Sequence, residues 1–311
     1  MPLVNVPMTV PEAAQPTALR VSSPAKINLY LGVTGTRPDG YHELATIFER
    51  VELADELLLE PREDGITCAC DHPAVPADDQ NLVVRAAQRL QAACDIRRGL
   101  HITIRKRIPV AGGLGGGSSN AATVLANLNR WWRLGLSREQ LMLLAREVGA
   151  DVPFFIAETP FALGVGRGDV VLPIPTSIIF WHVLVTPDVR LSTADVFRVW
   201  DTLGSSAGAA NLSQLAQLLS ALLEHQPETA AGLVWNHLAS ASARLSPAVS
   251  EAEELLTRAG ASAVSLSGSG PTMVATMLHE AEARRVATRV VQERPDWQVA
   301  VTRTATDGKS L

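Results

Sequence analysis

Hydrophobic and polar residues alternate along much of the first half of the chain, with the period of two that is typical of strands with one buried face. This alternation predicts strands at Arg20–Thr34, at Leu44–Leu59 with a break near Ala54 and Asp55, and at Gly99–Pro109. Between the first two, Arg37–Tyr41 carries Pro, Asp and Gly in succession, which predicts a turn. Apolar residues at helical spacing predict helices at Asn81–Cys94, with Asn81 as N-cap, at Ser118–Trp132, and from a Ser137–Gln140 capping box to about Val148.

The second half of the chain mixes shorter strands with helices. Strands are expected at Ile178–Val185, Ala263–Ser267, Met273–Met277 and Trp297–Thr302. Helices are expected at Leu212–Leu223, at Ser246–Ala259 with Ser246 as N-cap and Pro247 in the first turn, and at His279–Gln292. Small residues indicate loops at Gly204–Asn211 and in the turn SGSGP, Ser267–Pro271. This order of elements predicts an α+β protein.

The length of 311 residues is enough for about two domains, each with its own core. We expect a poorly ordered extension over residues 1–19, a first domain over residues 20–162 and a second over residues 163–311. The extension lacks the basic start and the continuous apolar core of a signal peptide. No apolar run approaches the roughly 20 residues that a membrane helix needs. A cytoplasmic protein without a membrane partner is therefore expected.

Charge and cysteine content narrow the function classes. A formal net charge of -5 provides no basic surface for nucleic acid, so no nucleic-acid partner is expected. An anionic ligand would have to be held by a local positive potential. Cys68, Cys70 and Cys94 are odd in number and lack CxxC spacing, which indicates reduced thiols rather than a disulfide framework or a zinc site.

The stretch PVAGGLGGGSSNAA, Pro109–Ala122, lies between a predicted strand and a predicted helix. Glycine has no Cβ, so such a loop can adopt positive φ and bring backbone N–H groups close to an anion. The first amides of the following helix and the positive end of its dipole would face the same anion. The sequence therefore predicts a phosphate-binding loop, most simply for a nucleotide.

Two common phosphate-binding motifs do not fit this loop. A Walker loop needs Lys followed by Ser or Thr after its last glycine, whereas Gly117 precedes Ser118 and Ser119. The dinucleotide motif G-x-G-x-x-G cannot be placed on Gly113 and Gly115, because position 118 is serine. A flexible Gly/Ser linker is the structural alternative, but linkers seldom join a patterned strand to a patterned helix.

Several segments together resemble the GHMP kinase superfamily. They are PAKINLYL (Pro24–Leu31), DGYHEL (Asp39–Leu44), the glycine loop, GVGRGD (Gly164–Asp169), GADVPFF (Gly149–Phe155) and SGSGP, and the resemblance spans about Val21–Thr304. It implies a two-domain GHMP kinase fold: an N-terminal, ribosomal-protein-S5-domain-2-like, ATP-binding domain and a C-terminal, ferredoxin-like, substrate-binding α/β domain. PAKINL, DGYHEL and GADVPFF in combination imply a kinase that uses ATP and Mg²⁺ to phosphorylate the 2-hydroxyl of a cytidine diphosphate-linked methylerythritol, in the non-mevalonate isoprenoid pathway.

The resemblance gives two residues catalytic roles. Lys26 would lie beside the acceptor hydroxyl and offset charge on the transferred phosphoryl group; from residue type alone, a strand lysine is more often a solvated edge residue. Asp151 would lie near the same alcohol, orient it and accept its proton late. Its position two residues before Pro153 is also what a plain helix N-cap would show.

The resemblance also implies contacts with the acceptor. Asn28, on the same strand face as Lys26, would hold the methylerythritol end. His42 would bind the cytosine edge and Tyr41 would pack on the base, although a loop pair of this kind is usually a surface feature. The remaining acceptor residues implied are Thr193 and Phe197, in the segment RLSTADVF, and Gly268 and Ser269 in the second glycine turn. Asn236-His237 departs from the Asn-Asp of many relatives.

For ATP, the resemblance implies that the glycine loop surrounds the phosphates and that other residues lie near the adenosine. The nucleotide-binding residues expected are Asn81, Lys106, Pro109, Gly112, Gly113, Leu114, Gly115, Gly116, Gly117, Ser118 and Ser119. Ser118 or Ser119 would also reach Mg²⁺, and no metal site made by protein side chains alone is expected. Lys106 could instead belong to a solvated charged face with Arg105 and Arg107.

Two alternatives stay open from the sequence. One is a kinase of the same superfamily with a different alcohol acceptor. The other is a non-catalytic nucleotide-binding or ribosome-associated module, against which the presence of both Lys26 and Asp151 counts. A monomer or a weak homodimer is expected.

Overall fold

The protein is described from a computed structural model that covers residues 17–203 and 210–306. Most of the expected N-terminal extension, residues 1–16, lies outside the described residues. So do residues 204–209 of the predicted loop Gly204–Asn211.

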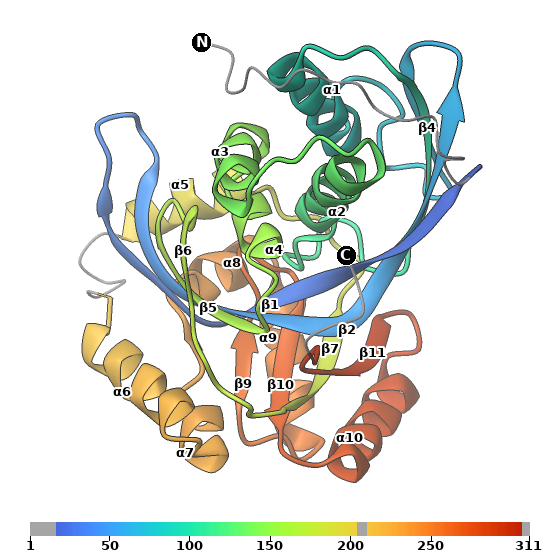
Figure 1. Ribbon diagram of the computed structural model, residues 1–311. Helices are drawn as coiled ribbons and strands as arrows, with labels where there is room; N and C mark the ends of the chain where they lie inside the picture. The colour runs from blue at the N-terminus through green and yellow to red at the C-terminus, as the bar shows by residue number, and fades with distance from the viewer. Residues whose placement is uncertain (1–16, 204–209, 307–311) are drawn as a thin grey trace.

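The first sheet is built on two long antiparallel strands, β1 (Leu19–Thr36) and β2 (His42–Arg62), which cross the middle of the molecule (Figure 1). The other strands of this sheet are β3 (Ile66–Cys70), β4 (Gly99–Arg105), β5 (Phe161–Gly166), β6 (Val170–Pro173) and β8 (Trp235–Asn236). Their order is β3-β4-β2-β1-β8, with β5 paired to the free half of β2 and β6 to β5. The predicted turn between β1 and β2 is confirmed, with Gly40 at a φ of 83°.

The break predicted in β2 near Ala54 and Asp55 is wrong, because the strand is continuous. The register with β1 shifts just before this point, between the pairs Pro24–Ala54 and Lys26–Arg50. Asp55 is buried there, and its carboxylate accepts hydrogen bonds from the backbone N–H groups of Arg107 and Ile108. From sequence alone, an acidic residue inside a strand suggests that the strand breaks there, because the hydrogen-bond partners that satisfy its carboxylate lie about fifty positions away.

Helices cover one face of this sheet. They are α1 (Leu82–Cys94), α2 (Gly116–Trp131), α3 (Arg138–Val148) and the short α4 (Val152–Ile156). Figure 1 shows them gathered above β1 and β2, and their apolar sides form one buried cluster with the sheet. The predicted cap is confirmed, since Asn81 accepts a hydrogen bond from the N–H of Val83, and so is the Ser137–Gln140 capping box.

A second, antiparallel sheet lies against the opposite face. Its order is β11-β7-β10-β9, from strands β7 (Trp181–Thr186), β9 (Val264–Leu266), β10 (Met273–Met277) and β11 (Gln298–Arg303). Around it are α5 (Thr193–Leu203), α6 (Leu212–Leu223), α7 (Pro227–Ala231), α8 (Ala239–Leu245), α9 (Pro247–Arg258) and α10 (Glu280–Glu293). Side chains of β1 and β2, among them Ile27 and Ile47, share a buried cluster with Phe180 and Leu184 of the second sheet.

The predicted α+β class is confirmed, as are the strands and helices expected in the second half of the chain, to within a few residues. Ser246 precedes α9 as expected, but its side chain makes no capping hydrogen bond among the described residues. The boundary at residue 162 stays a prediction: β5 spans that position and belongs to the first sheet.

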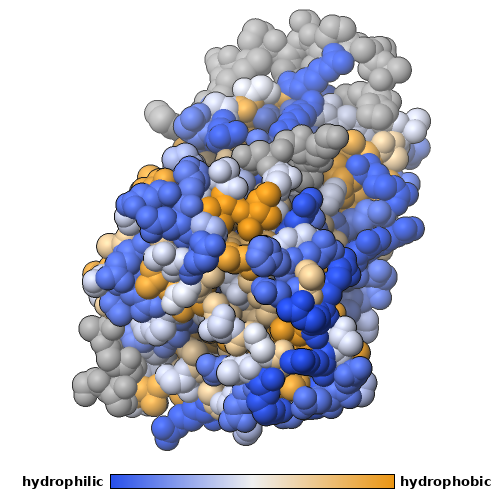
Figure 2. All heavy atoms as spheres, turned by 90° about the horizontal axis from the view of Figure 1, so that it is seen from below, coloured by the Kyte–Doolittle hydropathy of each residue, from blue (hydrophilic) through white to orange (hydrophobic). Residues whose placement is uncertain are grey.

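The surface seen from below carries mostly hydrophilic side chains, with hydrophobic ones in small separate groups (Figure 2). In the part of the chain that the structure describes, no helix is both long enough and apolar enough to cross a bilayer.

Candidate active site

Two cavities meet at the glycine loop between β4 and α2. One has a volume of about 710 Å³ and lies between β1, β2, α5 and the turn that follows β9; the other, of about 360 Å³, lies between α1, β4 and the loop. Gly113, Gly115 and Ser118 line both. A molecule in one cavity and a molecule in the other would therefore face each other across this loop.

The loop takes a conformation that needs glycine at two positions. Gly113 has a φ of 77° and Gly115 a φ of 67°, in the left-handed region that L-residues with a Cβ avoid. Space requires glycine as well: a Cβ on Gly113 would lie 2.2 Å from the carbonyl oxygen of Ser267, and one on Gly115 would lie 2.9 Å from Cγ of Lys26. The loop thus packs directly on the second glycine turn and on β1.

Residues predicted to bind the nucleotide surround the smaller cavity. Those that line it are Asn81, Lys106, Pro109, Gly112, Gly113, Leu114, Gly115, Gly116, Gly117 and Ser118. The helix α2 begins at Gly116, so its first backbone N–H groups have no acceptor within the helix and point towards this end. Ser119 is placed differently, since its hydroxyl is buried against the hydroxyl of Ser23 at 2.8 Å.

Lys106 does not belong to a solvated face. Its ammonium group is almost fully buried and pairs with the carboxylate of Asp55, whereas the neighbouring Arg105 is exposed. Asp55 also accepts the two backbone N–H groups that precede Pro109. One buried carboxylate therefore fixes both Lys106 and the start of the glycine loop.

Lys26, Asn28 and Asp151 lie together where the two cavities meet. Nζ of Lys26 lies 3.4 Å from a carboxylate oxygen of Asp151 and donates a 2.7 Å hydrogen bond to Oδ1 of Asn28. The backbone N–H of Lys26 donates to the carbonyl of Leu114, in the glycine loop. Lys26 is only 3% exposed, so it is not a solvated edge residue.

Asp151 occupies the position before α4, but its carboxylate makes no capping hydrogen bond within the described residues. Its side chain lines the larger cavity instead and is about one-third exposed there. The carboxylate is thus available on the cavity side, next to the ammonium group of Lys26.

The second glycine turn closes the site from the other sheet. The N–H of Gly268 donates a 2.9 Å hydrogen bond to Oδ1 of Asn28, and the hydroxyl of Ser267 donates to the carbonyl of Gly113. Ser269 is hydrogen-bonded through its hydroxyl to Thr193 at the start of α5, at 2.9 Å. Asn236 donates to the carbonyls of Leu266 and Gly268, so this part of the Asn-His pair supports the turn.

The far end of the larger cavity is aromatic. Tyr41 is 59% exposed at its rim. His42 is largely buried, and its ring stacks on Phe197 with centroids 4.5 Å apart. Nε2 of His42 lies 2.8 Å from a carboxylate oxygen of Asp201. The two residues predicted to read a base therefore lie in the same cavity as Lys26, at the end where α5 covers it.

Comparison with known proteins identifies the family. The GHMP kinases N terminal domain matches residues 81–159, and the GHMP kinases C terminal family matches residues 211–296. A protein from Shouchella clausii named 4-diphosphocytidyl-2-C-methyl-D-erythritol kinase is 40% identical over 267 residues, 86% of this chain and 88% of that protein. A protein of the same name from Gloeobacter violaceus is 39% identical over 291 residues, 93% and 95% of the two chains. The chain belongs to this family of GHMP kinases.

A crystal structure of 4-(cytidine 5'-diphospho)-2C-methyl-D-erythritol kinase agrees with the fold, with a TM-score of 0.76 at 31% identity over 93% of this chain and 100% of that one. As a GHMP kinase the chain is an ATP-dependent kinase, and the resemblance predicted from its motifs is confirmed. A non-catalytic module is not supported. The roles of individual site residues stay predictions.

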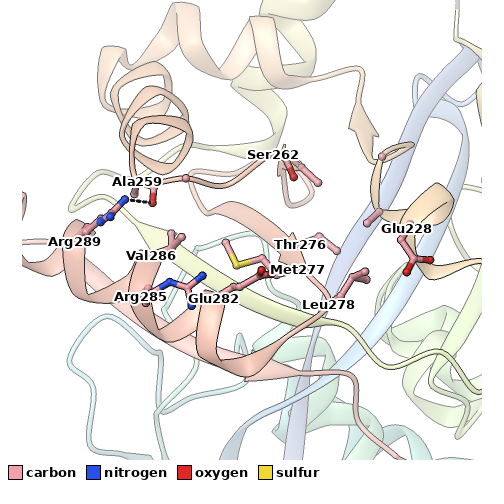
Figure 3. Close-up of a pocket in the computed structure, with 14 residues that line it drawn as sticks. Glu228, Ala259, Ser262, Thr276, Met277, Leu278, Glu282, Arg285, Val286 and Arg289 are labelled. Carbon is pink, nitrogen blue, oxygen red and sulfur yellow. Dashed lines mark hydrogen bonds between the residues drawn. The ribbon is translucent and has the colours of Figure 1, made fainter.

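A third cavity, of about 540 Å³, lies away from this GHMP kinase site, between α7, α9, β10 and α10 (Figure 3). Its described lining includes none of the predicted site residues. Two acidic side chains, Glu228 and Glu282, accompany Arg285 and Arg289, and Arg289 donates a 2.9 Å hydrogen bond to the carbonyl of Ala259. The mixed charges do not define a ligand class.

Some residues of the site were missed from sequence. They are Thr46, Phe48, Asp55, Arg167 and Asp201. Arg167 lies in the segment GVGRGD, which the motifs had already singled out, so a signal for it was present. For the others only the three-dimensional contacts reveal the role.

Proposed function

We propose that the chain transfers the γ-phosphoryl group of ATP to the 2-hydroxyl of 4-diphosphocytidyl-2-C-methyl-D-erythritol, giving the 2-phosphate and ADP in the non-mevalonate isoprenoid pathway. One observation carries the proposal: two cavities meet at a glycine loop beside the Lys26–Asp151 pair. The smaller cavity would hold ATP, and the larger one would hold the acceptor with its hydroxyl at this meeting point.

In this arrangement Lys26 supplies fixed positive charge. Asn28, Asp151 and the face of Phe48, 5.5 Å away, hold its ammonium group in place. Phosphoryl transfer spreads negative charge over the equatorial oxygens of the transferred group. A preorganised ammonium group beside those oxygens stabilises the transition state without reorganising during the reaction.

Asp151 orients the acceptor. An alcohol is a much weaker acid than a carboxylic acid, so early deprotonation by Asp151 is disfavoured. A carboxylate beside the hydroxyl can instead accept its hydrogen bond, hold it in line with the phosphoryl group and take the proton late. This order suits the loose transition state of phosphoryl transfer.

The residues present fit a magnesium ion that arrives on the triphosphate. Across residues 17–203 and 210–306, no group of three or more His, Cys, Asp or Glu side chains is placed to hold a metal ion. Mg²⁺ in kinases keeps several waters and phosphate oxygens and needs few protein ligands. Ser118, which lines both cavities, is better placed to reach it than Ser119, whose hydroxyl is bonded to Ser23. When bound, the ion neutralises charge on the β- and γ-phosphate oxygens.

The aromatic end of the larger cavity would select the cytosine. Tyr41 offers an exposed ring for stacking, and His42 offers polar ring atoms next to Phe197. Base–aromatic stacking contributes about 1–3 kcal/mol per base in single-stranded nucleic-acid complexes. A kinase for a small alcohol would have no need of this end.

The direct test is an acceptor panel. The purified chain is incubated with ATP, Mg²⁺ and either 4-diphosphocytidyl-2-C-methyl-D-erythritol, homoserine, galactose or mevalonate, and ADP and the phosphorylated product are quantified. We expect turnover of the cytidyl compound only. Absence of turnover, or equal turnover of another alcohol, would contradict the proposal.

A Tyr41→Ala, His42→Ala double variant tests the base-binding end separately. We expect its KM for the cytidyl acceptor to rise by about 10-fold or more, because stacking and hydrogen bonds to the base are lost. Its KM for ATP should stay unchanged, since both residues line only the larger cavity. An unchanged acceptor KM would show that the base lies elsewhere.

We also expect a monomer or a weak homodimer that acts in the cytoplasm without a nucleic-acid partner. The net charge of -5 and three free cysteines support this expectation. Sedimentation velocity checks the first point, and titration with RNA at modest salt checks the last, since an RNA-binding protein shows a steep salt dependence.

A further inference from the structure

Arg167 lies in the turn between β5 and β6, part of the GVGRGD segment to which the proposed mechanism gives no role. Its side chain lines the larger cavity and is 30% exposed there. Gly166 and Gly168 on either side have φ values of 75° and 90°, so the turn depends on two left-handed glycines to present the arginine.

The turn lies between the two ends of the cavity. On one side the guanidinium carbon of Arg167 lies 5.5 Å from the centre of the Tyr41 ring, at the end proposed for the base. On the other side a Cβ on Gly168 would lie 3.4 Å from the ring of Phe48, whose centre is 5.5 Å from Nζ of Lys26. Arg167 therefore lies along the path from the base-binding end to the reacting end.

The guanidinium group is held in place before any ligand binds. Asp169 accepts a hydrogen bond from the backbone N–H of Arg167 at 3.1 Å and a second from Nη2 at 3.0 Å. Burial alone would raise the pKa of Asp169, but these hydrogen bonds lower it overall, so its carboxylate stays ionised. Within the described part of the chain, Nη2 is the guanidinium nitrogen bonded to this carboxylate, which uses one of the five N–H donors and leaves the other four to serve a ligand.

From this geometry we infer that Arg167 binds the diphosphate that joins the cytidine to the methylerythritol in the acceptor. The inference rests on the proposed function, because that acceptor carries its diphosphate between the two groups that the cavity ends would hold. A planar, fixed guanidinium suits phosphate oxygens better than a flexible ammonium group does. The other arginine among the described lining residues, Arg198, is 69% exposed and pairs with Asp195, so it is far less constrained.

The experiment compares the binding of CDP and cytidine, in the absence of ATP, to the wild type, Arg167→Met and Arg198→Met by isothermal titration calorimetry. We expect the wild type to bind CDP at least 10-fold more tightly than cytidine. In Arg167→Met the affinity for CDP should fall by about 10–100-fold, the usual effect of losing a charged hydrogen bond, while cytidine affinity stays within about 3-fold. In Arg198→Met the affinity for CDP and the affinity for cytidine should both stay near the wild-type values.

The outcomes distinguish a phosphate-binding role of Arg167 from a purely structural one. If Arg167 only supported the Tyr41 ring, CDP and cytidine would weaken equally and their ratio would not change, which would overturn the inference. A wild type without preference for CDP would overturn it too. Arg167→Lys, which keeps the charge but not the planar fork, should retain part of the preference and guards against a folding defect in Arg167→Met.

Kinetics separate this inference from the proposed function. We expect Arg167→Met to raise the KM for 4-diphosphocytidyl-2-C-methyl-D-erythritol by about 10–100-fold, with kcat and the KM for ATP nearly unchanged. If the wild type turned the acceptor over and Arg167→Met did so with the same KM, only the inference would fail. If the wild type did not turn it over, the proposed function itself would fail.

Discussion

At the scale of single residues, the candidate site is centred on a lysine that is buried on a strand and held on several sides. Nζ of Lys26 contacts a carboxylate, an amide oxygen and an aromatic face, and its backbone N–H bonds the glycine loop. Burying a charge is costly unless it is paired. A buried and paired lysine of this kind is therefore expected where its charge acts on a ligand, and is less expected where the residue only stabilises the fold.

The substitution Asp151→Asn separates a catalytic role from a structural one. We expect kcat to fall by about 10²–10⁴-fold, because a neutral amide orients the hydroxyl poorly and cannot accept its proton. The KM for ATP should hardly change. No stability should be lost through the helix cap, since the described Asp151 carboxylate makes no capping hydrogen bond; any loss would come from weaker pairing of the buried Lys26 ammonium group with a neutral amide.

Ser137→Ala is the matched control for that measurement. Ser137 makes a true capping box with Gln140, so its loss should cost about 1 kcal/mol of stability without affecting kcat. If Asp151→Asn kept near-wild-type turnover and lost stability as Ser137→Ala does, Asp151 would be a helix cap and not a catalytic residue.

Sequence motifs located most of the candidate site residues but could not give their partners. The glycine loop and Asp151 belong to short, distinctive segments, and the structure places them at one cavity junction with Lys26. Asp55 offered no such signal, because an isolated Asp in a strand pattern suggests a break, and its carboxylate bonds a segment about fifty residues away. Contacts between distant segments have no local pattern from which they could be predicted.

At the scale of elements, the site is an assembly of turns packed on one another. The glycine loop bonds β1 through Leu114 and the second glycine turn through Gly113, and that turn bonds Asn28 on β1. The two turns lie so close that a Cβ on Gly113 would clash with the carbonyl oxygen of Ser267, and one on Gly268 would lie 3.2 Å from the carbonyl oxygen of Gly113. The glycine loop is thus shaped by its neighbours as well as by its own glycines.

Gly113→Ala tests this packing, with Gly65→Ala as its control. Both glycines have positive φ, so each substitution carries a backbone cost of roughly 1 kcal/mol. Around Gly65 no described heavy atom lies within 4 Å of the added Cβ, whereas at Gly113 the Cβ would lie 2.2 Å from the carbonyl oxygen of Ser267.

We therefore expect Gly113→Ala to lose roughly 1–3 kcal/mol more stability than Gly65→Ala. It should also lower kcat/KM for ATP by about 10²-fold, since a displacement of about 1 Å in a positioning element can have that effect. Chemical denaturation and steady-state kinetics measure the two quantities. Equal behaviour of the two variants would mean that the loop does not need its contact with the second turn.

The helix α5 shows what sequence reasoning missed at this scale. Phe197, Trp200 and Asp201 lie on one face of it and hold the His42 ring by stacking, by an edge contact and by a hydrogen bond. Of these three, the segment RLSTADVF suggested Phe197 alone; its other predicted residue, Thr193, bonds Ser269 instead. The i, i+3, i+4 spacing of the three was visible in the chain, but its target on β2 was not.

At the scale of the whole molecule, the two sheets are joined by a buried polar cluster. Nε2 of His182 on β7 lies 2.9 Å from Oε1 of Glu49 on β2, and the hydroxyl of Thr304 donates to the same oxygen at 2.6 Å. Glu49 and His182 are both fully buried. The candidate site spans the same contact between the sheets, because the glycine loop lies on one sheet and the second glycine turn on the other.

Glu49→Leu therefore tests whether the cluster holds the two halves together. Glu52 on the same strand is the matched control, since it pairs with Arg303 of β11 at 2.8 Å but at an exposed position. Leaving a buried hydrogen-bond donor without its acceptor typically costs about 1–3 kcal/mol, whereas an exposed pair contributes about 0–1 kcal/mol. We expect the free energy of unfolding, measured by chemical denaturation, to fall by an amount in the first range for Glu49→Leu and in the second range for Glu52→Leu.

Activity gives the second readout of Glu49→Leu. If the cluster positions the second glycine turn over the glycine loop, the folded fraction of the variant should show a lower kcat/KM for both substrates, because both cavities end at that contact. Glu52→Leu should keep wild-type kinetics. Equal stability losses for the two variants, or an unchanged kcat/KM in Glu49→Leu, would mean that apolar packing between the sheets alone sets the geometry of the site.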